Sequence, residues 1–256
     1  MERDLAMVNG KIIAFDERRN IVIPGDETAT LNYSIRHFIA AANQAIQTHG
    51  YFAVALSGGS TPKAIYKGLA AAENRLQIDW TKVLLFWGDE RCVPRDHPDS
   101  NYKMAMDAAF SKLPLKPEHI FPMNGTGDLE KNALAYEQLI RENIPSTRFD
   151  LIMLGLGEDG HTASLFPHTQ GLHAKNRLVV PNYVPEKEVW RLTLTFDCIN
   201  NGEQIALYVI GASKAEIVKK VLQGEYDPEK YPSQRVGTEA HKAFWILDEA
   251  VAVLHV

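Results

Sequence analysis

The stretch Phe149-Asp-Leu-Ile-Met-Leu-Gly-Leu-Gly-Glu-Asp-Gly-His-Thr-Ala-Ser-Leu-Phe-Pro167 contains the clearest fold signal in the chain. Its apolar run from Leu151 to Leu154 is followed by glycine and predicts a buried strand. Two acidic residues, a glycine and His161 follow, and Thr162 to Ser164 is a candidate start for a helix. Parallel α/β sheets bind ligands beyond the carboxyl ends of their strands, so His161 is our leading catalytic candidate.

Two further stretches have the same arrangement of an apolar strand followed by a polar turn. One is Phe52-Ala-Val-Ala-Leu-Ser-Gly-Gly-Ser-Thr-Pro62. The other is Val83-Leu-Leu-Phe-Trp-Gly-Asp-Glu-Arg91, which runs on through Ser100-Asn-Tyr102. If the three strands are parallel neighbours, their carboxyl ends meet at one edge of the sheet. We therefore expect the three polar turns to form one pocket.

The rest of the chain alternates between strand-like and helix-like patterns. This alternation predicts an α/β fold in a single domain over residues 1–256, with a mostly parallel, Rossmann-like sheet and helices on both faces. The expected helices span residues 28–49, 62–74, 101–111, 128–143 and 214–223, with a short terminal helix from Asp248. The expected strands span residues 20–24, 52–56, 83–87, 120–121, 151–154, 190–196, 204–210 and 243–247, with 178–180 as a weaker candidate.

The composition is that of an ordinary globular protein and excludes several functional classes. A net charge of −5 gives no basic surface for nucleic acid. No apolar run reaches the roughly 18 residues of a membrane-spanning helix, and Met1 to Leu5 lacks the apolar core of a signal peptide. Cys92 and Cys198 form no CxxC pair, so we expect no disulfide framework and interpret Cys92 as a small buried thiol. A cytoplasmic protein fits these features best.

The turn after the strand at 52–56 has the character of a phosphate-binding loop. Glycines between a strand and a helix let backbone N–H groups approach a phosphate, and hydroxyl groups add donors. The loop matches neither GxGxxG nor the Walker spacing, and a plain tight turn is the alternative. There is no GxSxG elbow, so a covalent serine nucleophile is not expected. The loop residues are Ser57, Gly58, Gly59, Ser60 and Thr61.

Three cationic residues are candidate ligands for the same anion. Lys214 lies at a strand-to-helix turn, where a lysine can act as a point charge. Arg91 can fork onto phosphate oxygens, reach the other end of a sugar or shape the pocket. Arg191 precedes a strand and can equally well pair with a carboxylate. Each of them alone is more often a solvated surface charge.

His161 has the chemistry of a general base, because its ordinary pKa of about 6.5 lets it accept and return a proton near neutral pH. Asp159 stands two residues earlier and is a candidate to orient the ring or a substrate hydroxyl. His161, His168 and His173 match no zinc signature, so we expect neither a metal nor a cofactor.

These motifs resemble the 6-phosphogluconolactonase family. The resemblance rests on SGGSTP at 57–62, GDERCVP at 88–94 with SNY at 100–102, and GLGEDGHTASLFP at 155–167. It extends to RLTLT at 191–195, GASK at 211–214 and WILD at 245–248. The related glucosamine-6-phosphate deaminases have the motif GHIAFNEP, with a glutamate before the proline. This chain has Phe166 at that position, which argues against the deaminase.

The resemblance implies hydrolysis of 6-phospho-D-glucono-1,5-lactone in the oxidative pentose phosphate pathway. It implies that residues 57–61, Lys214 and Arg91 hold the phosphate, and that His161 activates water beside C1. Backbone N–H groups near Gly157 or Gly160 are the expected oxyanion donors. The expected partner is the sugar-phosphate lactone alone, with a monomer or weak dimer as the oligomeric state. A deaminase-like isomerase and a non-catalytic sugar-phosphate sensor remain as alternatives.

Overall fold

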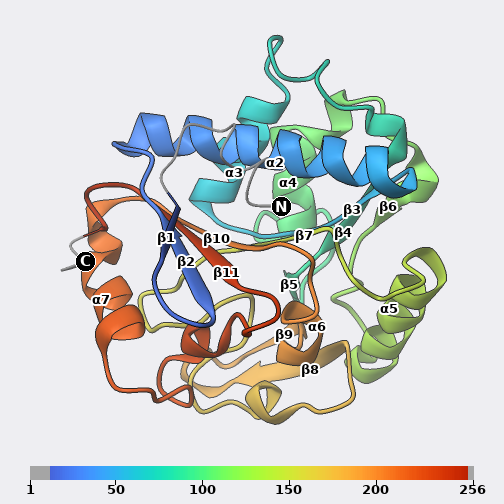
Figure 1. Ribbon diagram of the computed structural model, residues 1–256. Coiled ribbons are helices and arrows are strands. Elements are labelled where there is room, and N and C mark those ends of the chain that lie inside the picture. The colour runs from blue at the N-terminus through green and yellow to red at the C-terminus, as the bar shows by residue number, and fades with distance from the viewer. Residues whose placement is uncertain (1–11, 253–256) are drawn as a thin grey trace.

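The central sheet contains eight strands in a computed structural model that describes residues 12–252 (Figure 1). Their order is β1-β2-β11-β10-β7-β3-β4-β6, and every neighbouring pair is parallel except β1 and β2. The prediction of a mostly parallel sheet is confirmed. The strands are β1 (Ile12–Ala14), β2 (Arg19–Val22), β3 (Phe52–Leu56), β4 (Val83–Trp87), β6 (Ile120–Phe121), β7 (Leu151–Leu154), β10 (Ile205–Val209) and β11 (Ala243–Leu247).

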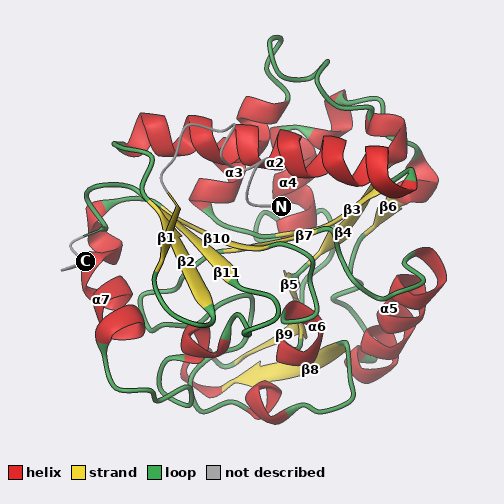
Figure 2. Ribbon diagram, in the orientation of Figure 1, coloured by secondary structure: helices red, strands yellow, loops and turns green. Residues whose placement is uncertain are grey.

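Helices cover both faces of this sheet, as expected for parallel strands (Figure 2). On one face lie α2 (Glu27–His49), α3 (Ser60–Leu69) and α4 (Asn101–Ala108). On the other lie α5 (Leu129–Asn143), α6 (Phe196–Ile199) and α7 (Ala215–Gln223). The central strands β3, β4, β7 and β10 are buried along their whole length, which explains why their sequences are continuously apolar.

Helix α3 ends five residues before the predicted boundary at residue 74. The side-chain amide of Asn74 donates to the carbonyl oxygen of Gly68 at 2.8 Å and so occupies an acceptor that a longer helix would use. Gly68 also allows α3 to pack closely on α2, because a Cβ at this position would lie 2.2 Å from Cδ1 of Ile35. The end of α3 is thus set by a polar side chain beyond it.

A second, antiparallel sheet has the order β5-β9-β8 and was predicted only in part. It consists of β5 (Asp89–Arg91), β9 (Val189–Leu194) and β8 (Val179–Val184). Gly88 joins it to the central sheet, since its N–H donates to the carbonyl of Leu56 and its carbonyl accepts from the N–H of Leu194, each at 2.8 Å. The small sheet therefore begins directly at the carboxyl end of β4.

One predicted helix is not found, and a second can be followed only over its first residues. Residues 162–165 form a turn closed by an isolated bridge between Thr162 and Leu165, because Ala163 has a left-handed backbone (φ 48°) that no α-helix accepts. After β11 the chain makes a turn in which the N–H of Val251 donates to Asp248. The remainder of that predicted helix, like the segment from Met1 to Leu5, lies outside the described residues. None of the helices described has the length and apolar character needed to span a bilayer.

Candidate active site

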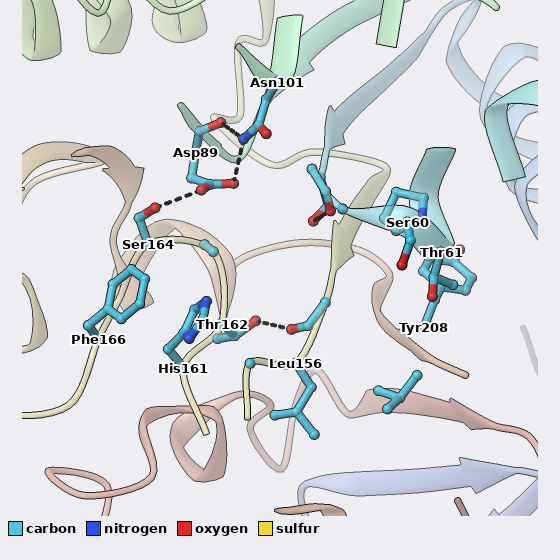
Figure 3. A pocket seen from close by; sticks show the side chains of 18 of the residues that line it. Ser60, Thr61, Asp89, Asn101, Leu156, His161, Thr162, Ser164, Phe166 and Tyr208 are labelled. Carbon is cyan, nitrogen blue, oxygen red and sulfur yellow. Dashed lines mark hydrogen bonds between the residues drawn. The ribbon is translucent and has the colours of Figure 1, made fainter. Parts of the chain in front are cut away.

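Strands β7, β3 and β4 are direct neighbours, so their following turns meet at one edge of the sheet. The turns line a cavity of about 280 Å³ (Figure 3). Of the side chains and loop residues expected to catalyse the reaction or bind the phosphate, Asp159 alone does not line this cavity. Those that do are Ser57, Gly58, Gly59, Ser60, Thr61, Arg91, His161, Arg191 and Lys214.

The loop after β3 presents the beginning of α3 to the cavity. No side chain caps this helix, and the N–H groups of Ser60 and Thr61 donate to no protein group among the described residues. Gly59 has a left-handed φ of 104°. A Cβ on Gly58 would lie 2.0 Å from Oδ1 of Asn101, so that position has no room for a side chain. Free N–H groups at a helix N-terminus form a site for an anion.

Tyr66 fixes the start of this loop, which the sequence did not indicate. Its hydroxyl accepts a hydrogen bond from the N–H of Ser57 at 3.0 Å and donates to the carbonyl of Ser57 at 2.8 Å. Tyr136 holds the end of β4 similarly, accepting from the N–H of Trp87 at 2.7 Å and lying 3.0 Å from the carbonyl of Phe121. Both tyrosines are buried. Hydrogen bonds with buried tyrosine hydroxyls thus fix the carboxyl ends of β3 and β4.

His161 is held by Asp159. Its Nδ1 lies 2.5 Å from Oδ1 of Asp159, and the same oxygen accepts the backbone N–H of His161 at 3.1 Å. An ionised carboxylate only accepts, so in the neutral form of the imidazole Nδ1 holds the proton and Nε2 has a free lone pair. Burial raises the pKa of Asp159, but the hydrogen bond to His161 and its charge outweigh burial and lower this pKa to about 2. The pair therefore has a fixed tautomer.

Phe166 stacks on the ring of His161, with centroids 3.9 Å apart and planes inclined by 21° (Figure 3). In Figure 3 these two rings lie at one end of the cavity, and Ser60 and Thr61 lie at the other. The candidate base His161 and the candidate anion-binding loop, residues 57–61 (the anion loop), therefore lie on opposite sides of the pocket.

The N–H groups of Gly157 and Gly160, in the loop from Gly157 to His161 (the histidine loop), are not free to act as the expected oxyanion donors. The N–H of Gly157 donates to the carbonyl of His161 at 2.8 Å, and the N–H of Gly160 donates to the carbonyl of Gly157 at 3.0 Å. Both groups are used to close the loop, so the expectation that they face a ligand was wrong. Gly157 is needed because a Cβ would lie 2.0 Å from Nδ1 of His161.

Arg91 and Arg191 are paired directly across β5 and β9 and both line the cavity. Burial lowers the pKa of Arg191, and the nearby charge of Arg91 lowers it further. Within the described part of the chain neither forms a salt bridge; each donates to a backbone carbonyl instead. The carboxylate partner that was the alternative for Arg191 is not found there. With Lys187 and Lys214 these arginines give the cavity a strongly positive wall.

Asp89 organises one wall of the cavity through neutral donors. Its Oδ2 accepts from the hydroxyl of Ser164 at 2.6 Å, and Asn101 donates to its carbonyl at 3.0 Å (Figure 3). Glu90 instead accepts the N–H groups of Asn101 and Tyr102 and holds the start of α4. Alternation along β5 sends the two acids to opposite sides, which a loop interpretation of this segment could not reveal.

Neither the thiols nor the acidic groups indicate redox or metal chemistry at this site. Both cysteines are free, and burial raises the pKa of Cys92 to about 11. Among residues 12–252 no three side chains of His, Cys, Asp or Glu are grouped so that they could ligate a metal ion.

An uncapped helix N-terminus and a histidine–aspartate pair stand at the carboxyl edge of this doubly wound sheet, an arrangement typical of α/β proteins that bind small anionic ligands. Residues 25–245 match the model of the family described as Glucosamine-6-phosphate isomerases/6-phosphogluconolactonase. The chain belongs to this family, and the resemblance found in its motifs is confirmed.

Individual relatives agree with this assignment. The 6-phosphogluconolactonase of Chlamydia pneumoniae is 43% identical over 237 residues, which cover 92% of this chain and 90% of the relative. The structure of 6-phosphogluconolactonase from Trypanosoma cruzi is 26% identical with a TM-score of 0.81, covering 96% of this chain and 99% of that one. A monomeric glucosamine-6-phosphate deaminase, 22% identical with a TM-score of 0.79 over 92% of this chain and 99% of its own, shares the fold.

Proposed function

We propose that this chain is a 6-phosphogluconolactonase, which hydrolyses 6-phospho-D-glucono-1,5-lactone to 6-phospho-D-gluconate in the oxidative pentose phosphate pathway. The observation that carries the proposal is the position of His161, paired with Asp159 at the end of the cavity opposite Ser60 and Thr61. Relatives that cover most of the chain and are named 6-phosphogluconolactonase support the same substrate.

The phosphate binds at the loop end in this proposal. The free N–H groups of Ser60 and Thr61 and the side chain of Lys214 supply donors and positive charge there. Arg91 and Arg191 add the positive potential of the cavity wall. Because the phosphate does not react, its binding energy serves to hold C1 beside His161.

The reaction follows from the tautomer of His161. Nε2 accepts a proton from water while the water oxygen bonds to C1 and the carbonyl electrons move onto oxygen. When the tetrahedral intermediate collapses, the bond from C1 to the ring oxygen breaks, and that oxygen takes the proton from Nε2. Throughout the reaction Asp159 accepts the hydrogen bond from the protonated Nδ1 of His161, and its negative charge balances that of the imidazolium. The new carboxylic acid then ionises in water.

An isomerase and deaminase acting on amino-sugar phosphates is the nearest alternative, because a deaminase shares the fold. Phe166 argues against it: its ring stacks on His161 at the position where the deaminase motif has a glutamate. Release of ammonia from glucosamine 6-phosphate would support the alternative.

We also propose that the protein acts in the cytoplasm as a monomer or weak dimer, without a nucleic-acid partner. Its net charge of −5 gives little attraction to a phosphate backbone. Sedimentation velocity at several concentrations tests the oligomeric state, and a stable dimer at nanomolar concentration would overturn that part.

The deciding experiment measures disappearance of 6-phosphogluconolactone made in situ, with wild type and His161→Ala compared with the spontaneous rate. We expect only the wild type to accelerate the reaction. If neither protein does, the lactonase proposal fails and a non-catalytic sugar-phosphate sensor, detected by binding without turnover, takes its place. If both do equally, the reaction stands but His161 is not its base.

A further inference from the structure

Lys187 is the one cation of the cavity wall that the sequence motifs did not single out. It ends the short turn from Pro185 to Lys187 that joins β8 to β9, and it lines the cavity. Its ammonium group lies 4.8 Å from the ring centroid of Phe166. Within residues 12–252 it forms no salt bridge, and its electrostatic contact there is with the aromatic face of Phe166.

Phe166 places Lys187 at the His161 end of the cavity. The same phenyl ring that the ammonium group contacts stacks on His161, with centroids 3.9 Å apart. Lys187 is thus a cavity-lining cation beside the candidate base.

The proposed reaction creates a negative charge at the His161 end of the cavity. The lactone is uncharged at C1, whereas the ring-opened product has a carboxylate there. Backbone N–H groups of Gly157 and Gly160 are unavailable because they close the histidine loop. Lys187 itself is exposed, although the ring of Phe166 is buried. A cation–π contact of an exposed ammonium group contributes only about 0.5–1 kcal/mol, and the flexible stem of a lysine lets it exchange that contact for an anion.

We propose that Lys187 binds the C1 carboxylate of the product and thereby distinguishes the ring-opened acid from neutral sugar phosphates. This inference rests on the proposed lactonase function. Phe166 has two roles in this proposal. Its ring stacks on His161, and it holds the ammonium group of Lys187 when no carboxylate is bound.

The test compares two ligands that differ only at C1. Titration calorimetry measures binding of 6-phospho-D-gluconate and of D-glucitol 6-phosphate, which has a hydroxymethyl group in place of the carboxylate. We expect Lys187→Met to weaken binding of the acid about tenfold, the effect of one charge-assisted hydrogen bond, and to change binding of the alcohol less than about twofold. Lys187→Arg should keep most of the preference for the acid.

Lys230→Met is the matched control, because Lys230 also lies over an aromatic ring, that of Tyr231 at 5.4 Å, but does not line the cavity. Equal weakening of both ligands in Lys187→Met would mean that Lys187 binds the phosphate, and unchanged affinities would mean that it binds neither; both results overturn the inference. Lactone hydrolysis is assayed on the same wild-type sample. Turnover without a Lys187 effect overturns the role of Lys187 alone, whereas absence of turnover overturns the proposed function.

Discussion

Oδ1 of Asp159 holds His161 twice, accepting the backbone N–H at 3.1 Å and lying 2.5 Å from the ring Nδ1. The first contact fixes the loop, and the second fixes the tautomer. Because the pKa of Asp159 is lowered to about 2, the carboxylate stays ionised at every pH at which a neutral imidazole could act as a base. The aspartate is thus a positioning group.

Asp159→Asn should lower kcat on the order of 10²-fold or more with little change in KM. An amide can present its N–H to Nδ1 and so reverse the tautomer, which leaves Nε2 without a free lone pair. Steady-state hydrolysis of the lactone measures both constants. Glu158→Gln, an exposed neighbour on the same loop, is the control and should behave as wild type. Wild-type kcat in Asp159→Asn would show that the pair has no catalytic role.

His161→Ala should lose nearly all enzymatic kcat while KM, where it remains measurable, changes little. The substitution removes a base but none of the proposed phosphate ligands. The spontaneous rate of lactone opening sets the background for this measurement. A large rise in KM with unchanged kcat would assign His161 to binding instead.

Lys214→Ala should mainly raise KM, by about 10- to 100-fold, because it removes a charged phosphate ligand. Lys219→Ala, an exposed lysine further along α7, serves as the control for net charge. If kcat falls together with kcat/KM, the phosphate contact is used in the transition state as well. Wild-type kinetics in Lys214→Ala would exclude the residue from the site.

Tyr66→Phe should destabilise the protein by about 1–3 kcal/mol, because both backbone groups of Ser57 lose a buried partner. It should also raise KM, since the anion loop starts at Ser57. Tyr136→Phe removes the corresponding bonds at Trp87 and should cost similar stability with a smaller change in KM. Urea unfolding and kinetics on both variants give the comparison. Equal KM values in the two variants would show that Tyr66 acts on stability alone.

His37 should make stability depend on pH. It is buried between Tyr208, 2.8 Å from Nδ1, and Gln204, 3.1 Å from Nε2. Burial lowers its pKa from 6.5 to about 4, against the smaller opposing effect of the Gln204 bond. The unfolded chain therefore binds a proton more readily, so the contribution is complete above about pH 6.5 and is lost as pH falls to about 4.

Urea unfolding of wild type and His37→Gln at several pH values tests this. Between pH 7 and 4 the wild type should lose about 3 kcal/mol relative to the variant, which has no titrating group there. His97→Gln, at an exposed site, should show no such difference. A constant gap between wild type and His37→Gln across this range would contradict the prediction.

The sequence was sufficient for the parts of the site that follow strongly apolar strands. Residues 57–61, His161 and Lys214 were found because each comes directly after such a strand, and parallel strands bring their carboxyl ends together. In the small sheet β9 was expected, but β5 was not, and β8 was only a weaker candidate at residues 178–180. The reason is that β5 contains only Asp89, Glu90 and Arg91, and β8 contains Pro181 and Asn182. Both strands form through pairing with β9, which no local propensity reports.

Other differences from the predictions also depend on contacts that form only in the folded chain. The helix expected at residues 162–164 fails because Ala163 adopts a left-handed backbone within a hydrogen-bonded turn. The donors expected at Gly157 and Gly160 were wrong because a tight loop uses its own N–H groups first. Tyr66 and Lys187 were not recognised because their partners, Ser57 and Phe166, lie on other elements and are known only once the chain is folded.

Arg91 lies directly opposite Arg191 where β5 pairs with β9. Like charges placed directly opposite each other across two strands repel, and their partial burial strengthens the repulsion. In the proposed complex, the charge of a bound phosphate dianion would offset part of this repulsion. We therefore expect the pairing of β5 with β9 to be more stable when the pocket is occupied, so that the substrate would also act as a structural counter-ion.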